Sequence, residues 1–263
     1  MRLDVYITEK GLAKSRERAK KIIISGKVLV DSKVISKPSF EVNDSDEIVV
    51  TDDYCEYVGR GGLKLEGALK EFSVDLSGLV CADIGASTGG FTDCMLKNGA
   101  KKVYAVDVGH GQLDKGLAND KRVVVLEGVN VRYATPDLFD EKPEFMSCDL
   151  SFISLKLVME KLVSVLAENG RMIVLIKPQF EVGRSSVGKN GIVNDKKSHI
   201  RMLDDMMMFF VNIGLSVRGL TYSSVTGGDG NIEYLAFLCR GNDSYVLPTD
   251  TTSLVEKAFI TLK

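Results

Sequence analysis

The sequence predicts an α/β protein in two parts, a small α+β unit at the N-terminus and an open, mainly parallel sheet with crossover helices behind it. Five apolar runs between residues 79 and 178 have the length of buried strands, and enough residues separate them for helices. The first run leads into a glycine-rich turn that opens a helical pattern. Residues 1–50 instead combine a basic helical stretch with short β-rich pieces, so we expect them to fold separately.

Composition narrows the class of protein. At 263 residues and 44% hydrophobic content, the chain can build one or two domains with an apolar core. The five cysteines form no C-x-x-C pair and there are only two histidines, so we expect neither a metal site nor a disulfide framework. The start, MRLDVYITEK, lacks a signal-peptide pattern, and no apolar run approaches the roughly 20 residues that span a bilayer. We therefore expect a cytoplasmic protein without a membrane partner.

The N-terminal unit is basic. Nine Lys or Arg residues lie between Lys10 and Lys37, against two acids, although the whole chain carries a formal charge of −2. A polyanion would therefore meet this unit first. A helix is predicted from Ser15, a plausible N-cap, to Ser25, with Gly26 ending it, and VLVDSKVI and DEIVV follow as β-rich pieces.

The string RLDVYITEKGLAKSRERAKKIIISGKVLVDSKVISKPSFEVNDSDEIVV resembles the alpha-L RNA-binding motif domain over nearly the whole unit. That family presents a basic helical pair to the RNA backbone. The resemblance implies that RNA is the partner of this unit. It also implies four phosphate-contacting residues: Lys14, Arg16, Arg18 and Lys20.

We expect four segments along the chain: an RNA-binding domain at 1–54, a linker at 55–58, a catalytic domain at 59–247 and a C-terminal tail at 248–263. The strands of the catalytic domain are predicted at LVCADIG, KVYAVDV, VVVLEG, EFMSCDLSF and RMIVLIKP, with a crossover helix such as Leu155 to Glu168 between the last two. Two later runs, LSVRGLTYSS and IEYLAFLCR, flank the glycine-rich TGGDGN and predict an antiparallel edge hairpin. Such a hairpin is typical of a Rossmann-like methyltransferase.

A cofactor site is predicted where the first strand ends. Asp83 precedes the glycine-rich turn, where it would repel a pyrophosphate but suit a cationic ligand end, which argues against NAD. Asp107 ends the next strand, at the spacing of an acid that accepts both hydroxyls of a ribose. The pair resembles an S-adenosylmethionine motif. The predicted cofactor-binding residues are Asp83, Gly85, Ser87, Gly89, Gly90, Phe91 and Asp107.

Polar residues also end later strands, where open α/β sheets have their crevice. Asp149 follows EFMSC, and Lys177 closes RMIVLI, where a lysine is costly to desolvate without a carboxylate. We expect Glu233 to be that partner. Lys64 lies in GRGGLKL, whose glycines allow a close approach to substrate.

The strings YVGRGGLKL, DIGASTGGFTDC, CDLSFISL, IKPQFEVGR and GNIEYL resemble the TlyA family of FtsJ-like ribose methyltransferases, and with the N-terminal unit the resemblance covers about nine tenths of the chain. The family's Lys-Asp-Lys-Glu tetrad matches Lys64, Asp149, Lys177 and Glu233. In the connector, Cys55 and Tyr57 stand where the family often has a basic residue and a tryptophan. The resemblance implies 2′-O-methylation of a cytidine ribose in ribosomal RNA.

The tetrad suits this chemistry independently, because ammonium groups stabilise a developing alkoxide while an acceptor takes the hydroxyl proton. We expect Lys177 to activate the hydroxyl and Lys64 to orient the nucleotide. A base methyltransferase stays open: Asp149 to Phe152 distantly echoes the amino-methyltransferase motif, with Ser151 at its usual proline, and carbon-5 chemistry would need Cys148 or Cys81 as nucleophile. A non-catalytic RNA-binding or assembly protein is the other alternative, together with the haemolysin label that the family often carries.

Overall fold

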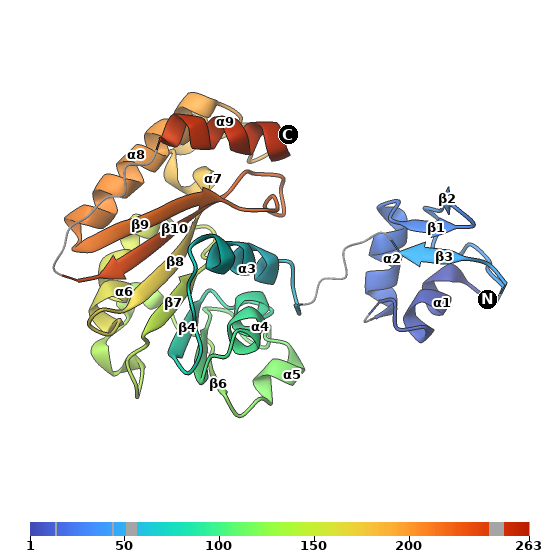
Figure 1. The fold of residues 1–263 in the computed structure, drawn as a ribbon, viewed down its shortest axis with the longest axis horizontal. Helices are drawn as coiled ribbons and strands as arrows, with labels where there is room; N and C mark the ends of the chain where they lie inside the picture. The colour runs from blue at the N-terminus through green and yellow to red at the C-terminus, as the bar shows by residue number, and fades with distance from the viewer. Residues whose placement is uncertain (14, 44, 51–56, 242–249, 263) are drawn as a thin grey trace. The chain divides into compact units, whose positions relative to one another are not determined.

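The computed structural model describes residues 1–13, 15–43, 45–50, 57–241 and 250–262. The chain divides into two compact units, Met1–Glu56 and Tyr57–Lys263 (Figure 1). Each unit has its own hydrophobic core. The boundary falls within the predicted linker, of which residues 55 and 56 lie outside the described residues.

The first unit packs two helices against a small antiparallel sheet with strand order β2-β1-β3. Its core includes Leu3, Ile7, Ile23 and Val28, each completely buried. The predicted N-cap is present, because the Ser15 hydroxyl accepts a hydrogen bond from the Arg18 amide at 3.2 Å. The elements are α1 (Leu3–Glu9), α2 (Arg16–Ile24), β1 (Val28–Val30), β2 (Lys33–Val34) and β3 (Ile48–Val50).

The second unit is built on a seven-stranded sheet of order β6-β5-β4-β7-β8-β10-β9. Strands β4 to β8 pair in parallel, and β10 pairs antiparallel with both β8 and β9. This confirms the predicted Rossmann-like sheet and its edge hairpin. The strands are β4 (Val80–Ile84), β5 (Lys102–Val106), β6 (Val123–Leu126), β7 (Phe145–Cys148), β8 (Arg171–Ile176), β9 (Leu215–Tyr222) and β10 (Tyr234–Arg240).

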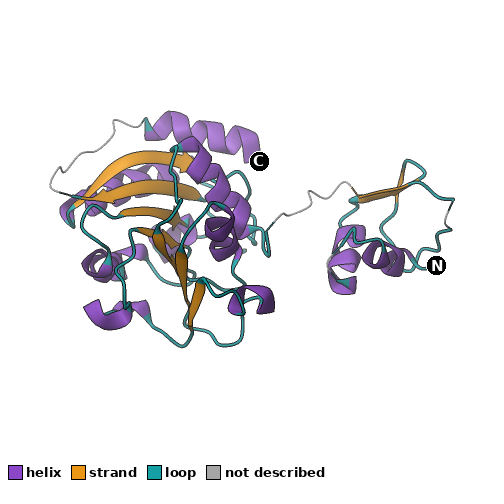
Figure 2. Ribbon diagram, turned by 60° about the horizontal axis from the view of Figure 1, so that its bottom comes forward, coloured by secondary structure: helices purple, strands orange, loops and turns teal. Residues whose placement is uncertain are grey.

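Helices lie on both sides of this sheet (Figure 2). One core combines alternate strand residues with buried side chains of α6, α8 and α9, while α3 and α4 pack on each other and α4 contacts β4 and β5. The helices are α3 (Gly61–Glu71), α4 (Gly90–Lys97), α5 (Lys115–Ala118), α6 (Met159–Val165), α7 (Pro178–Glu181), α8 (Lys196–Asn212) and α9 (Thr251–Leu262), with short 3₁₀ turns at Val131–Tyr133, Pro136–Leu138, Leu155–Leu157 and Arg184–Ser186.

The structure adds two details to the sequence prediction. The crossover from 155 to 168 is a 3₁₀ turn followed by the shorter α6, because Leu166 leaves the helix with an extended backbone. The predicted tail contains α9, whose Val255 and Ala258 are completely buried in the same core as α8. Residues 251–262 therefore belong to the second unit, while 248 and 249 lie outside the described residues.

Asp4 joins the two helices of the first unit. Its buried carboxylate accepts hydrogen bonds from the Nε atoms of Arg2 and Arg16, both at 2.9 Å. The hydrogen bond from Arg2, followed by that from Arg16, lowers the pKa of Asp4 to about 2 against the opposing effect of burial. A charge at this position thus stabilises the fold.

We predict that Asp4→Asn lowers the free energy of unfolding of the first unit by about 1–2 kcal/mol, a modest loss because both arginine side chains are about half exposed. The folded pKa lies below the ordinary value of 3.8, so this contribution is present above about pH 4 and is lost as the pH falls through about 2. Hydrogen exchange of the α1 amides between pH 5 and pH 2 measures it. The matched control is Glu9→Gln on the same helix, where the acid is exposed. An equal effect of both substitutions would contradict this role of Asp4.

Candidate active site

The carboxyl ends of β7 and β8 meet the amino end of β10. Asp149 follows β7 and Lys177 follows β8. Because β10 runs antiparallel to β8, with Tyr234 opposite Ile176, its start lies at the same edge of the sheet and brings Glu233 there. Lys64 reaches this edge from α3, outside the sheet. The four side chains of the predicted tetrad thus gather from four separate elements.

The four charges form two ion pairs. The Nζ atom of Lys64 lies 2.5 Å from Glu233 Oε2, and the Nζ atom of Lys177 lies 2.6 Å from Asp149 Oδ1. The sequence analysis expected Glu233 to pair with Lys177, and the structure corrects this. Lys177 turns to the acid of the neighbouring parallel strand, while Lys64 enters from α3 and binds Glu233.

Burial makes these pairs necessary. The side chains of Lys64 and Lys177 are 11% and 10% exposed, and that of Glu233 is 3% exposed. Burial raises the pKa of Glu233, and the positive charge of Lys64 opposes this. Removing one partner would leave an uncompensated charge in a largely dry site, which is strongly destabilising. Each lysine is therefore held at a defined place by its carboxylate partner.

Lys177 has a second partner. Its Nζ atom donates a hydrogen bond to the Ser151 hydroxyl at 2.8 Å. Ser151 stands two residues after Asp149 and is exposed. In the sequence this serine stands out only as a departure from a proline motif, and its contact with a tetrad lysine comes from the fold.

The glycine-rich turn after β4 runs close to Asp149. Gly85 has a φ of +86°, and a Cβ atom there would lie 2.3 Å from the Asp149 carbonyl oxygen. Any side chain would push the turn away from the tetrad. The turn ends at Gly89, whose left-handed backbone begins α4 at Gly90, with the buried ring of Phe91 behind it. A glycine at position 85 thus brings this turn close to the tetrad.

Asp107 holds the other side of this turn. Its Oδ2 accepts a hydrogen bond from the Ser87 amide at 2.7 Å, and its Oδ1 accepts one from the Gly109 amide at 2.7 Å. The residue is only partly buried and lines a cavity of about 510 Å³ together with apolar residues such as Val108, Val129 and Val131. Each carboxylate oxygen retains a lone pair for a ligand hydroxyl.

Asp83 lies in β4, just before the turn, and lines neither this cavity nor the smaller one described next. It is completely buried, and the hydroxyls of Thr92 and Ser147 donate to its two oxygens at 2.7 and 3.0 Å. Burial raises its pKa to about 6, although both hydroxyl donors oppose this. In this structure Asp83 thus contacts α4 and β7, and its place near the cationic end of a cofactor stays a prediction. It joins β4 to α4 and β7 under the turn.

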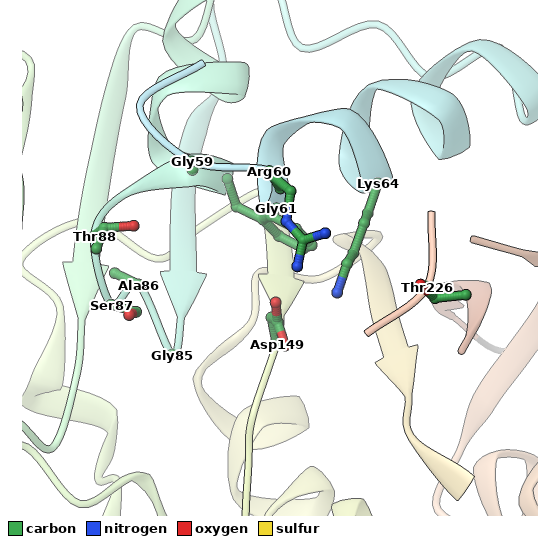
Figure 3. Close-up of a pocket in the computed structure, with 12 residues that line it drawn as sticks. Gly59, Arg60, Gly61, Lys64, Gly85, Ala86, Ser87, Thr88, Asp149 and Thr226 are labelled. Carbon is green, nitrogen blue, oxygen red and sulfur yellow. The ribbon is translucent and has the colours of Figure 1, made fainter. Parts of the chain in front are cut away.

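A smaller cavity of about 200 Å³ adjoins the first, and the two share Gly85, Ser87 and Asp149. Arg60, Lys64 and Asp149 point into this space from two sides (Figure 3). Arg60 is exposed and, among the described residues, its side chain has no ion pair. The sequence analysis missed Arg60, although GRGGLKL placed it four residues before Lys64.

The end of the predicted linker is fixed to the second unit. Tyr57 is buried, and a Cβ atom on Gly62 would lie 2.3 Å from its ring, so only glycine fits there. The Val58 amide donates to Asp93 Oδ2 at 2.8 Å, at the start of α4. Both contacts hold the chain just before Arg60. Cys55, the other departure from the family pattern, lies outside the described residues.

The predicted RNA-binding residues differ in their surroundings. Arg16 is exposed at its guanidinium but anchored to Asp4, and Arg2 shares that anchor, which the sequence analysis missed. Lys20 is exposed on α2 and Arg18 is partly exposed. Lys14 lies outside the described residues.

Among the described residues, no helix is long and apolar enough to cross a membrane.

Comparison with protein families gives two matches. Residues 57–240 match the model of FtsJ-like methyltransferases, and residues 1–48 match the S4 domain. These two segments fall in the two compact units of the structure.

Relatives are similar over nearly the full length. YqxC of Bacillus subtilis, named as an rRNA methyltransferase, is 48% identical over all of this chain and 95% of its own. A 16S/23S rRNA (cytidine-2′-O)-methyltransferase, TlyA of Mycobacterium tuberculosis, is 41% identical over 92% of this chain and 91% of its own. A solved structure named as a hemolysin from Streptococcus thermophilus is 43% identical, covers 99% of this chain and 96% of its own, and superimposes with a TM-score of 0.81. The chain therefore belongs to the TlyA family of FtsJ-like methyltransferases, with an S4 domain preceding the methyltransferase domain in the sequence.

Proposed function

We propose that this enzyme transfers a methyl group from S-adenosylmethionine to the 2′-hydroxyl of a cytidine in ribosomal RNA. The observation that carries the proposal is the pair of buried ion pairs, Lys64 with Glu233 and Lys177 with Asp149, beside a cavity that the glycine-rich turn borders. Relatives named for cytidine-2′-O methylation of 16S and 23S rRNA support the substrate.

The residues present fit the methyl donor. The larger cavity offers the apolar walls that an adenine needs and the Asp107 carboxylate for its ribose hydroxyls. The smaller cavity offers the turn from Gly85 to Gly90 and the cation of Arg60, which suits the carboxylate of the donor's amino-acid end. Asp83 supports this turn from below, through Thr92. When bound, the donor supplies a methyl group activated by its sulfonium charge.

The tetrad would prepare the hydroxyl. We assign to Lys177 the acceptance of the 2′-hydroxyl proton at Nζ, once the lysine has released one of its own protons to solvent, while the ribose oxygen would take the methyl group that a bound donor supplies. Asp149 stabilises the resulting ammonium at 2.6 Å. Lys64, fixed by Glu233, stabilises negative charge on the oxygen and orients the nucleotide. Holding the oxygen in line with the methyl group would supply much of the rate.

The geometry does not favour carbon-5 base chemistry. That reaction needs an accessible thiolate, but Cys81 and Cys148 are completely buried. Burial raises the pKa of Cys81 to about 12, and it raises the pKa of Cys148 further.

An amino methyltransferase has little use for two lysines at the methyl group. Its motif also has a proline where this chain has Ser151, whose hydroxyl binds Lys177.

The S4 domain supports RNA as the substrate. We assign phosphate contacts to the basic residues at the start of the chain, with Arg16 held in position by Asp4. A guanidinium fixed by a carboxylate on one side still has donors for a phosphate. The residues assigned to RNA contact are Lys14, Arg16, Arg18 and Lys20, with Arg2 added from its shared anchor.

The direct test is methyl transfer from labelled S-adenosylmethionine to purified ribosomal subunits and to deproteinised rRNA, followed by digestion to nucleosides. We expect 2′-O-methylcytidine, because the tetrad activates a hydroxyl. A base-methylated nucleoside would keep the cofactor but overturn the mechanism. Failure to bind S-adenosylmethionine by calorimetry would favour a non-catalytic RNA-binding protein.

We predict that Lys177→Met lowers kcat by at least about 100-fold, because the hydroxyl loses its proton acceptor. The affinity for S-adenosylhomocysteine, measured by calorimetry, stays within about threefold. Lys161→Met, an exposed lysine on α6, is the control and should change neither quantity. A loss of binding in Lys177→Met would place this lysine in the cofactor site.

We predict that replacing both Arg18 and Lys20 by alanine weakens RNA binding and reduces the slope of log K against log salt by about 1 to 2, because fewer counterions are released. Titration of an rRNA fragment at several salt concentrations measures the slope. Lys257→Ala removes an exposed charge from α9 and is the control. An unchanged slope would argue against phosphate contacts at α2.

A further inference from the structure

Ser151 contacts the proposed catalytic machinery through Lys177 Nζ. Its hydroxyl accepts a hydrogen bond from Lys177 Nζ at 2.8 Å, while the Asp149 carboxylate lies 2.6 Å from the same atom. Among the described residues, these are the two polar groups in contact with this nitrogen. Lys64 lines the smaller cavity, and Glu233 is bound to it.

We propose that Ser151 is a positioning residue, which fixes the direction in which Lys177 presents its nitrogen to the substrate hydroxyl. The proposal rests on the proposed function, in which Lys177 accepts the hydroxyl proton.

The geometry of a lysine nitrogen supports this role. Nζ has three positions around it besides its bond to Cε. The Ser151 hydroxyl occupies one of them through a hydrogen bond, whereas Asp149 contributes an ion-pair contact at 2.6 Å whose near oxygen makes no hydrogen bond, so Ser151 sets where the remaining positions point. With Asp149 alone, the nitrogen could turn about the Cε–Nζ bond and the contact would lose its direction. Proton transfer and in-line attack both require that direction.

The backbone of the segment around Ser151 is fixed by contacts that do not involve the Ser151 hydroxyl. The Asp149 amide donates to the Ile84 carbonyl at 2.9 Å, which fixes the start of the segment. Glu181 fixes its end, accepting from the Ser154 hydroxyl at 2.6 Å and from the Leu155 amide at 2.8 Å. Ser151 itself is exposed. Removing its hydroxyl therefore leaves the backbone in place and creates no buried cavity.

The test is the pair Ser151→Thr and Ser151→Val in the full-length enzyme. The two side chains have nearly the same shape, and only threonine keeps the hydroxyl. We expect Ser151→Val to lower kcat for 2′-O-methyl transfer by about 10- to 100-fold, and Ser151→Thr to stay within about threefold of wild type. The KM for rRNA and the affinity for S-adenosylhomocysteine should be unchanged in both variants.

A second measurement needs no turnover. In enzyme labelled with ¹⁵N-lysine, the side-chain nitrogen resonance of Lys177, assigned with Lys177→Met, should shift in Ser151→Val and stay near its wild-type position in Ser151→Thr.

The outcomes separate the two proposals. Equal kcat values and equal Lys177 resonances in the two variants would overturn the role of Ser151. A loss confined to rRNA KM or to cofactor affinity would also overturn it, since Ser151 would then be a binding residue. Base methylation by the wild-type enzyme would instead refute the proposed function, whatever the variants do.

Discussion

The site depends on one constraint, namely that charges withdrawn from water must be paired. Lys64, Lys177 and Glu233 are each about nine-tenths buried or more, and two ion pairs compensate them. These pairs join four elements, α3 and the segments next to β7, β8 and β10. The antiparallel register of β10 on β8 is what makes this possible, because it brings Glu233 to the edge where the parallel strands end. The same pairs keep Lys64 and Asp149 at the wall of the smaller cavity.

Three acids at the ends of neighbouring strands show how the environment divides similar residues. Asp83 is completely buried and its oxygens are bound by Thr92 and Ser147, so it holds elements together. Asp107 is partly exposed and accepts two backbone amides, which leaves capacity for ligand hydroxyls. Asp149 is bound to a lysine. Only the last two line a cavity, so a strand-end carboxylate indicates a ligand site only when it faces the crevice.

The sequence predicted the sheet, the hairpin and the cavity-lining Asp107, because strand periodicity and chain order determine which ends meet. It did not predict the pairing within the tetrad, since the contact of Lys64 with Glu233 spans 169 positions and depends on how α3 packs. The contacts of Asp83 with Thr92 and Ser147 could not be predicted for a related reason, because a fully buried strand has no alternation to show which face its side chain takes. Arg60 and Ser151 are exposed polar residues, and their type alone does not distinguish them from ordinary surface residues.

Ser151 also bears on the choice between ribose and base chemistry. The amino-methyltransferase motif has a proline at this position, and proline has no side-chain group to accept a hydrogen bond. A base amine can attack a methyl group without a strong proton acceptor, so that motif needs no oriented lysine. A ribose hydroxyl is a poor nucleophile until its proton is removed, and its activation depends on where the accepting nitrogen points. The serine and the lysine that it binds therefore fit the same reaction, and a proline in place of Ser151 would leave Lys177 with Asp149 alone.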